Sequence, residues 1–149
     1  MQSNVIIACD FSQEKQLFDF LKKFKNEKLF LKIGYELFFK FGESVVLKIK
    51  QMNHRIFLDL KLLDIPNTVE HGVSNLMKFQ PDLLSIHASG GIEMMKAALR
   101  GVGKHKTQLV AVTQLTSLSP TVLKKELLIN KDLSGVVQHY ASNAHTAKI

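Results

Sequence analysis

Short apolar runs recur along the chain, and each is followed by a longer segment in which apolar residues have helical spacing. We predict strands at residues 5–9, 29–33, 56–61, 83–86 and 109–112. The runs are almost uninterrupted, which is typical of strands buried on both faces, and we expect this of residues 5–9 in particular. Alternation of such strands with helices predicts an α/β fold in which helices cover a parallel sheet.

Apolar residues at helical spacing separate the predicted strands. The first helix has Leu17 and Leu21 on one face, and Ser12 is its predicted N-cap. We expect Gly42 to interrupt the second helix, and Pro66 is compatible with the first turn of the third. The predicted helices after the first cover residues 35–51, 65–79, 92–99, 120–128 and 132–147.

Two architectures fit this alternation, an open doubly wound sheet and a (β/α)8 barrel. A doubly wound nucleotide-binding fold normally has a Gly-rich phosphate loop after its first strand, whereas residues 10–13 are Asp-Phe-Ser-Gln. Polar residues lie at the end of every predicted strand, as catalytic groups do in barrels, so we predict a TIM (β/α)8 barrel. The polar strand ends are Asp10, Lys32, Asp59 with Lys61, His87 and residues 113–117.

The length of the chain modifies this prediction. A complete barrel takes about 250 residues, whereas the chain has 149. We therefore expect residues 1–149 to be the N-terminal portion of a single barrel domain, incomplete in this chain, with strands one to five and their helices.

The third predicted strand ends in the charged residues Asp59 and Lys61, and Asp64 follows in the next loop. Side chains alternate between the two faces of a strand, so Asp59 and Lys61 should share a face with Phe57 and lie side by side. Charges at the end of a buried strand cost free energy unless they are paired. We interpret the group as functional, because a surface ion pair has no need of such a position.

The chain carries an excess of positive charge. It has 20 Lys and Arg against 13 Asp and Glu, a net charge of +7 with His neutral. This excess suits an anionic small substrate or a nucleic acid. Because the lysines are dispersed along amphipathic segments and the aromatic residues form no stacking platform, we favour solvated helix faces and predict no nucleic-acid partner.

Cysteine content and hydropathy bear on location. Cys9 is the single cysteine, which excludes an internal disulfide, and we expect it to be buried and inert. No apolar run is long enough to cross a bilayer, and the N-terminus lacks the features of a signal peptide. We expect a cytoplasmic protein with no membrane partner.

The segment from Asp59 to Thr68 carries a family resemblance. Its sequence, D-L-K-L-L-D-I-P-N-T, resembles the D-x-K-x-x-D-I-x-x-T signature of the orotidine 5′-phosphate decarboxylase family. Further segments resemble other strand ends of this family in the same order, and several matches in order are far more specific than one short signature. These segments are residues 7–10 (IACD), 31–38 (LKIGYELF), 86–91 (IHASGG) and 111–117 (AVTQLTS).

The resemblance implies a carbon–carbon lyase that converts orotidine 5′-monophosphate into uridine 5′-monophosphate, as a homodimer and without a metal or organic cofactor. It implies that Lys61 is the general acid that protonates C6 of the pyrimidine. Lys32 and Asp59, with Asp64 of the other subunit, would complete an alternating Lys-Asp-Lys-Asp array. Physical chemistry agrees, because a fixed ammonium stabilises a carbanion at C6 and neighbouring opposite charges keep each group ionised.

Substrate-binding roles also follow from the resemblance. Asp10 is expected to hold the ribose, and Thr68 to contact the ligand across the dimer interface. Thr116 and Ser117 are expected to face the nucleotide and its base. In the family, a Gln and an Arg on late strand loops bind the phosphate and the pyrimidine, and residues 1–149 do not include these loops. We therefore expect residues 1–149 alone to have little or no activity.

Alternative functions stay open. One is a magnesium-dependent sugar-phosphate decarboxylase or aldolase of the same superfamily, which shares D-x-K-x-x-D but tends to carry an acidic residue where this chain has Lys32. Another is a truncated, inactive fragment of the decarboxylase. A third is a basic nucleic-acid binder, for which steep salt dependence of binding would be diagnostic.

Structural roles are the competing interpretation of most candidate residues. Lys32 alone would be a strand-end lysine that reaches solvent. Asp10 and Asp64 would cap helices, and residues 116–117 would form a turn. We interpret His87 as a packing or hydrogen-bonding residue rather than as an acid or base.

Overall fold

The computed structural model describes residues 5–24 and 26–149, whose strands form one parallel sheet in the order β1-β2-β3-β4-β5. Each strand pairs with the next along the chain, which is the order of consecutive β/α units in a barrel. The predicted parallel α/β architecture is confirmed. The strands are β1 (Ile6–Ala8), β2 (Phe30–Gly34), β3 (Arg55–Leu62), β4 (Leu83–His87) and β5 (Gln108–Val112).

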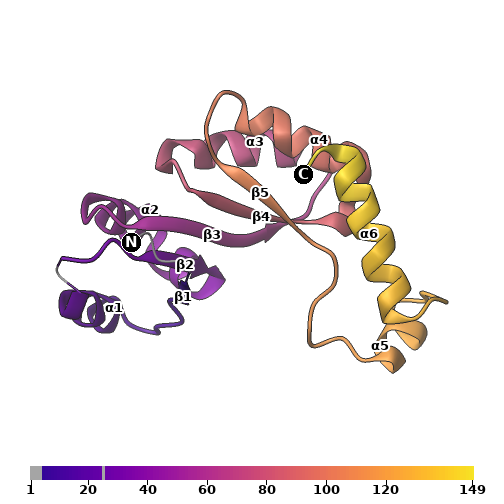
Figure 1. The fold of residues 1–149 in the computed structure, drawn as a ribbon, viewed down its shortest axis with the longest axis horizontal. Helices are drawn as coiled ribbons and strands as arrows, with labels where there is room; N and C mark the ends of the chain where they lie inside the picture. The colour runs from indigo at the N-terminus through magenta and orange to yellow at the C-terminus, as the bar shows by residue number, and fades with distance from the viewer. Residues whose placement is uncertain (1–4, 25) are drawn as a thin grey trace.

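Helices follow the strands and cover one face of the curved sheet. Helices α3 and α4 pack side by side, and α6 lies against α4 (Figure 1). The α-helices are α1 (Glu14–Leu21), α2 (Tyr35–Gln51), α3 (Pro66–Leu76), α4 (Gly91–Val102), α5 (Pro120–Lys125) and α6 (Leu133–Ala147). Short 3-10 turns follow three elements: η1 (Lys22–Phe24), η2 (Met77–Phe79) and η3 (Ala88–Gly90).

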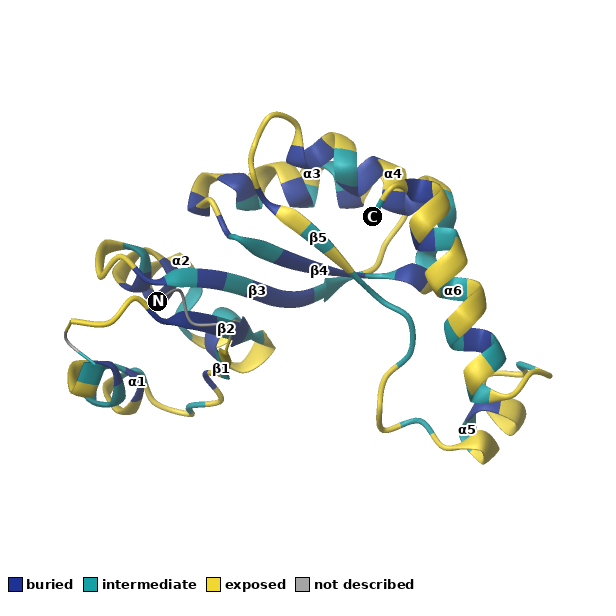
Figure 2. Ribbon diagram, viewed as in Figure 1, coloured by how far each residue is buried: buried dark blue, intermediate teal, exposed yellow. Residues whose placement is uncertain are grey.

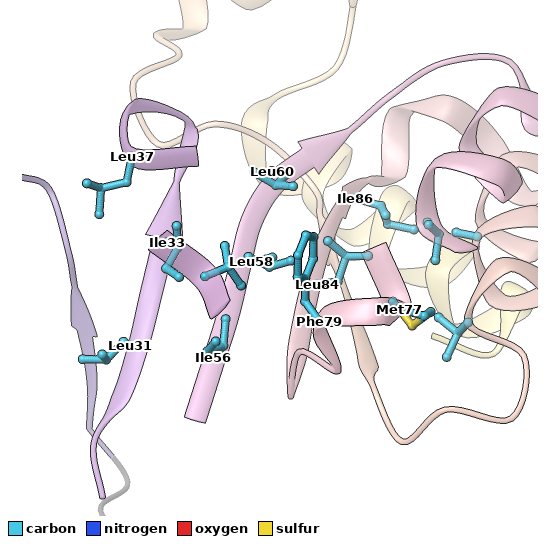
Figure 3. Packing of buried hydrophobic residues seen from close by; sticks show 14 of the residues in the cluster. Leu31, Ile33, Leu37, Ile56, Leu58, Leu60, Met77, Phe79, Leu84 and Ile86 are labelled. Carbon is cyan, nitrogen blue, oxygen red and sulfur yellow. The ribbon is translucent and has the colours of Figure 1, made fainter. Parts of the chain in front are cut away.

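The hydrophobic core lies between the sheet and these helices (Figure 3). Ile33, Leu58 and Ile86, from three neighbouring strands, are each 0% exposed, and Leu37 and Phe79 pack against them from the helical layer. Full burial of such a side chain stabilises the fold by about 1.5–3 kcal/mol. This core fixes β2, β3 and β4 firmly, and these strands carry the charged residues.

The two outer strands depart from the sequence-based expectation. Residues 5–9 were predicted to be buried on both faces, but β1 alternates between exposed and half-buried positions, and Val5 and Ile6 are 64% and 40% exposed. Strand β5 is likewise exposed or half-buried throughout (Figure 2). Within the described chain both strands pair on one side only, so less of their surface is covered.

Helix ends were predicted with mixed success. Helix α1 begins at Glu14 with Gln13 as N-cap, so the prediction that Ser12 caps it is wrong; the Ser12 carbonyl instead accepts a hydrogen bond from Lys40 Nζ (2.5 Å). Gly42 does interrupt α2, with φ 61° and ψ −146°. Pro66 occupies the first turn of α3, where its missing N–H is not needed.

Candidate active site

Lys32 and Asp59 come together because β2 and β3 are parallel neighbours whose carboxyl ends meet at one edge of the sheet. In the register of this pair, Lys32 lies opposite Phe57 and Gly34 lies opposite Asp59. The Lys32 Nζ is 3.2 Å from Asp59 Oδ2. The predicted clustering of these two strand-end charges is confirmed.

Lys61 reaches the same carboxylate from an irregular stretch of β3. Its φ is +43°, and the register of β3 with β4 shifts between Leu58 and Leu62, which marks a bulge. The Lys61 Nζ donates to Asp59 Oδ1 at 2.8 Å. The prediction that the two side chains lie side by side is confirmed, but the regular alternation used to predict it does not continue through Lys61, because the bulge and the positive φ interrupt the strand there.

Ser85 of β4 completes the cluster, and sequence reasoning missed it. Its side chain is fully buried, and its hydroxyl donates to Asp59 Oδ1 at 2.9 Å and accepts from the Lys61 backbone N–H at 2.8 Å. The signal that could have found it is a lone hydroxyl residue within an otherwise apolar run, two positions before His87. Such a residue needs a hydrogen-bond partner once it is buried.

The environment of Asp59 keeps its carboxyl ionised. Burial is the largest single influence on its pKa and raises it, but hydrogen bonds from Lys61, Ser85 and Lys32 together outweigh burial, so the pKa lies below its ordinary value. The Asp59 side chain is 12% exposed, against 25% and 28% for the Lys32 and Lys61 side chains. The array is therefore shielded at its carboxylate and open to solvent at its ammonium groups.

Aromatic side chains line a hollow beside Lys61. A hollow of about 500 Å³ is lined by Tyr35, Phe38, Phe39, Lys61 and His87, among others. The Lys61 Nζ lies 6.0 Å from the centre of the Tyr35 ring, and the Tyr35 hydroxyl donates to the Lys61 carbonyl oxygen at 3.5 Å. Burial, followed by the Lys61 charge, lowers the pKa of His87 and so favours the neutral imidazole.

The remaining acidic candidates lie apart from the array. Asp10 and Asp64 are exposed, and within the described chain neither makes a hydrogen bond or ion pair with Lys32, Asp59 or Lys61. The alternative that they cap helices is wrong, because the N-cap of α1 is Gln13 and that of α3 is Ile65. The Asp64 Oδ1 accepts from the adjacent Ile65 backbone N–H at 2.7 Å.

The hydroxyl candidates also remain separate from the array. Thr68 is exposed in the first turn of α3. Thr116 and Ser117 are exposed at the centre of a turn that is closed by a 3.1 Å hydrogen bond from the Leu118 N–H to the Leu115 carbonyl. The structure thus brings Lys32, Asp59 and Lys61 together and leaves Thr68, Thr116 and Ser117 without a side-chain partner among the described residues.

Cys9 is buried, as predicted, and is 1% exposed. Burial raises the pKa of its thiol to about 12, Asp10 adds to this rise, and Lys32 opposes it. The thiolate is therefore disfavoured, in agreement with an inert cysteine. Across residues 5–24 and 26–149, no group of three His, Cys, Asp or Glu side chains has the arrangement of a metal site, and every helix is too short or too polar to span a membrane.

Comparison with known proteins identifies the family. A model of the orotidine 5′-phosphate decarboxylase / HUMPS family matches residues 3–149. The chain belongs to this family. It is 46% identical over 147 residues to the orotidine 5′-phosphate decarboxylase of Bacillus cytotoxicus and 45% identical over 147 residues to that of Bacillus cereus. Each alignment covers 95% of this chain but 62% of the relative, so the chain spans less than two thirds of the length of these relatives.

Solved structures resemble the chain closely. Orotidine 5′-phosphate decarboxylase from Lactobacillus acidophilus superposes with a TM-score of 0.88 at 38% identity, over 96% of this chain and 67% of that one. An uncharacterized conserved protein from Geobacillus kaustophilus superposes with a TM-score of 0.93 at 39% identity, over 97% and 70%. The orotidine 5′-phosphate decarboxylase fold is a TIM barrel, and the described β/α units form part of it.

Proposed function

We propose that the protein containing this chain decarboxylates orotidine 5′-monophosphate to uridine 5′-monophosphate, and that Lys61 supplies the proton. The observation that carries the proposal is the array in which one buried carboxylate, Asp59, holds two ammonium groups at 3.2 and 2.8 Å. Membership of the family and the names of the curated relatives support the same reaction.

The reaction places specific demands on Lys61. The bond between C6 and the carboxylate carbon breaks, carbon dioxide leaves, and the electron pair remains at C6 of the pyrimidine. A fixed ammonium beside C6 stabilises that negative charge as it develops. The same ammonium then transfers a proton to C6 and becomes a neutral amine, which solvent reprotonates. Its 28% exposure leaves a path for that solvent proton.

Asp59 orients the general acid Lys61, and Lys32 shares the same carboxylate. The Asp59 carboxylate fixes the direction of the Lys61 side chain through one oxygen and that of Lys32 through the other. Because the site is formed in advance, its charges need no reorganisation during the reaction. A carboxylate beside the departing substrate carboxylate also raises the energy of the bound substrate.

A second copy of the chain completes the proposed site. Asp64 and Thr68 are exposed, and the apolar side chains Leu63 and Ile65 beside Asp64 are 54% and 66% exposed. Burial of such side chains favours association, which would carry Asp64 and Thr68 to the array of the neighbouring subunit. Within one subunit, we assign contacts with the ribose to Asp10 and contacts with the nucleotide to residues 116–117.

The magnesium-dependent alternative is disfavoured by the contacts of Asp59. Both of its oxygens are engaged, by Lys61 and Ser85 on one side and by Lys32 on the other. An ammonium at 3.2 Å repels a second cation from the same carboxylate. We expect turnover of the intact protein to be insensitive to a chelator, and loss of activity on chelation would favour the magnesium-dependent enzyme.

The proposal is tested by Lys61→Ala in the intact protein. We expect formation of uridine 5′-monophosphate to fall by at least about 100-fold, because the general acid and the fixed positive charge are lost together. Lys96→Ala is the matched control, since Lys96 pairs with Glu93 on the surface of α4 and its loss should leave the rate unchanged. Absence of decarboxylation by the native protein, or a Lys61→Ala rate equal to the control, would contradict the proposal.

A further inference from the structure

We propose that Ser85 is a positioning residue, whose single hydroxyl locks the bulged backbone of Lys61 to the carboxylate of Asp59 and so aims the Lys61 ammonium. The inference rests on the proposed function, because it concerns the geometry of the same acid. Within one subunit, the family resemblance places this array on β2 and β3, and the inference adds a part for β4.

The hydrogen bonds around Ser85 form a closed ring. The Lys61 backbone N–H donates to Ser85 Oγ at 2.8 Å, and that hydroxyl donates to Asp59 Oδ1 at 2.9 Å. The same Oδ1 accepts from Lys61 Nζ at 2.8 Å. The backbone and the side chain of Lys61 are therefore tied to each other through one serine and one carboxylate oxygen.

The bulge in β3 explains why the backbone of Lys61 needs this ring of hydrogen bonds. A lysine at φ +43° is in the left-handed region, which is strained for residues other than glycine and persists only where neighbours enforce it. The bulge also separates the Lys61 N–H from regular pairing with β4, since the register shifts between Leu58 and Leu62. Ser85 supplies the acceptor that this N–H would otherwise lack at a half-buried position.

The chemistry of the hydroxyl explains why this position holds a serine. A hydroxyl donates and accepts through one atom, and both functions are used here. Alanine would remove both, and cysteine would fill the space with a weak donor and a weak acceptor. Threonine would keep both functions on a β-branched side chain that suits a strand.

The test compares Ser85→Ala with Thr107→Val in the intact protein. Thr107 is the matched control, because its hydroxyl is likewise buried and donates a hydrogen bond to the Pro81 carbonyl at the opposite end of the sheet. We expect Ser85→Ala to lower kcat by about 10- to 100-fold with KM changed little, since small misplacement of a reacting group is costly. Thr107→Val should leave kcat near the native value. Ser85→Thr should also give a kcat near the native value, in contrast to Ser85→Ala.

The pH profile separates positioning from general loss of stability. Ser85 lowers the pKa of Asp59, so its removal should raise that pKa and move the acid limb of the rate profile to higher pH. The same shift should appear in the carboxyl-carbon titration of Asp59 by NMR, which needs no substrate. If Ser85→Ala does not fold, Ser85→Cys is measured in the same way.

The outcomes distinguish the two proposals. A native protein without decarboxylase activity whose Asp59 titration still depends on Ser85 overturns the proposed function and retains the positioning role. An active native protein in which the Ser85 variants match Thr107→Val in kcat, acid limb and Asp59 titration overturns the positioning role alone. Failure of Ser85→Thr to restore kcat in a folded protein also counts against it.

Discussion

Asp59 illustrates how one residue combines structure and chemistry. Its carboxylate receives hydrogen bonds from Lys61 and Ser85 and an ion pair from Lys32, and the three partners come from three neighbouring strands. The family resemblance identifies Lys61 and Lys32, but the role of Ser85 is visible only when β4 lies beside β3. A buried charge persists in a fold because such partners compensate for its lost hydration.

His54 is a second buried polar residue, and it predicts an acid-sensitive fold. Its Nδ1 accepts from the Leu29 N–H at 3.2 Å, and within the described chain its buried Nε2 has no partner. Burial lowers the pKa of His54 below its ordinary 6.5. The unfolded chain therefore binds the proton more readily, so the contribution of neutral His54 to stability is present above pH 6.5 and is lost as the pH falls through and below it.

We expect His54→Asn to be less acid-sensitive than the native protein, because the Asn Oδ1 can accept from the Leu29 N–H and does not titrate. The measurement is the urea midpoint at pH values on both sides of 6.5. His71→Asn, at an exposed position on α3, is the control and should retain the native pH dependence. Equal pH dependence in His54→Asn and the native protein would rule out this role of His54.

At the scale of elements, the packing of α3 against α4 depends on a close approach. Gly101 of α4 is buried, and a Cβ added there would lie 2.4 Å from the Glu70 carbonyl oxygen of α3. A backbone atom cannot move aside without shifting its helix. Gly72 lies within α3 itself, and a Cβ there would meet nothing within 4 Å. The close packing of α3 and α4 therefore requires glycine at position 101 but not at position 72.

We predict opposite effects of alanine at these two positions. Gly101→Ala should lower the free energy of unfolding by about 1–3 kcal/mol, because it forces the helices apart. Gly72→Ala should raise it by about 0.5–1 kcal/mol through the better helix propensity of alanine. Chemical denaturation of both variants measures the difference, and a Gly101→Ala variant as stable as Gly72→Ala would show that the helices do not meet as closely as described.

At the scale of the whole molecule, the described sheet has two outer strands, β1 and β5, that pair on one side only. Apolar side chains remain exposed along them, including Ile6 and Val110 at 40% and 36%. In relatives that are 62% covered by this chain, further sequence follows the matched region or precedes it. A closed barrel pairs every strand on both sides and gathers its catalytic groups at one end.

A peptide of residues 1–149 alone should therefore have little or no decarboxylase activity, because the sequence resemblance places the residues that bind the phosphate and the pyrimidine outside this range. The measurement is turnover of orotidine 5′-monophosphate by the purified peptide, with the orotidine 5′-phosphate decarboxylase of Bacillus cytotoxicus as reference. A peptide rate near that of the reference enzyme would refute the prediction. Addition of the unmatched part of the Bacillus cytotoxicus enzyme tests whether a complete barrel restores activity.

Much of the fold could be predicted because its determinants are local. Among the described residues, apolar runs and helical spacing located every strand and helix to within a few residues, and the family resemblance implied that Lys32, Asp59 and Lys61 would form one array. Side-chain capping was harder to predict, as Ser12 shows: α1 begins after Gln13 without any side-chain cap hydrogen bond, and residue type alone does not reveal that. The prediction that β1 is buried was wrong for another reason, because burial depends on what covers a strand rather than on the residues of the strand.

The sequence by itself determined the order of the β/α units, their parallel pairing and the chemical identity of the charged array, because periodicity and residue type are properties of short segments. Only the tertiary structure decided how the array is held. No glycine marks the left-handed conformation of Lys61, and Ser85 is separated from Asp59 by 26 positions in the chain. A hydrogen bond across two strands depends on their register, and register is set by the packing of the whole core.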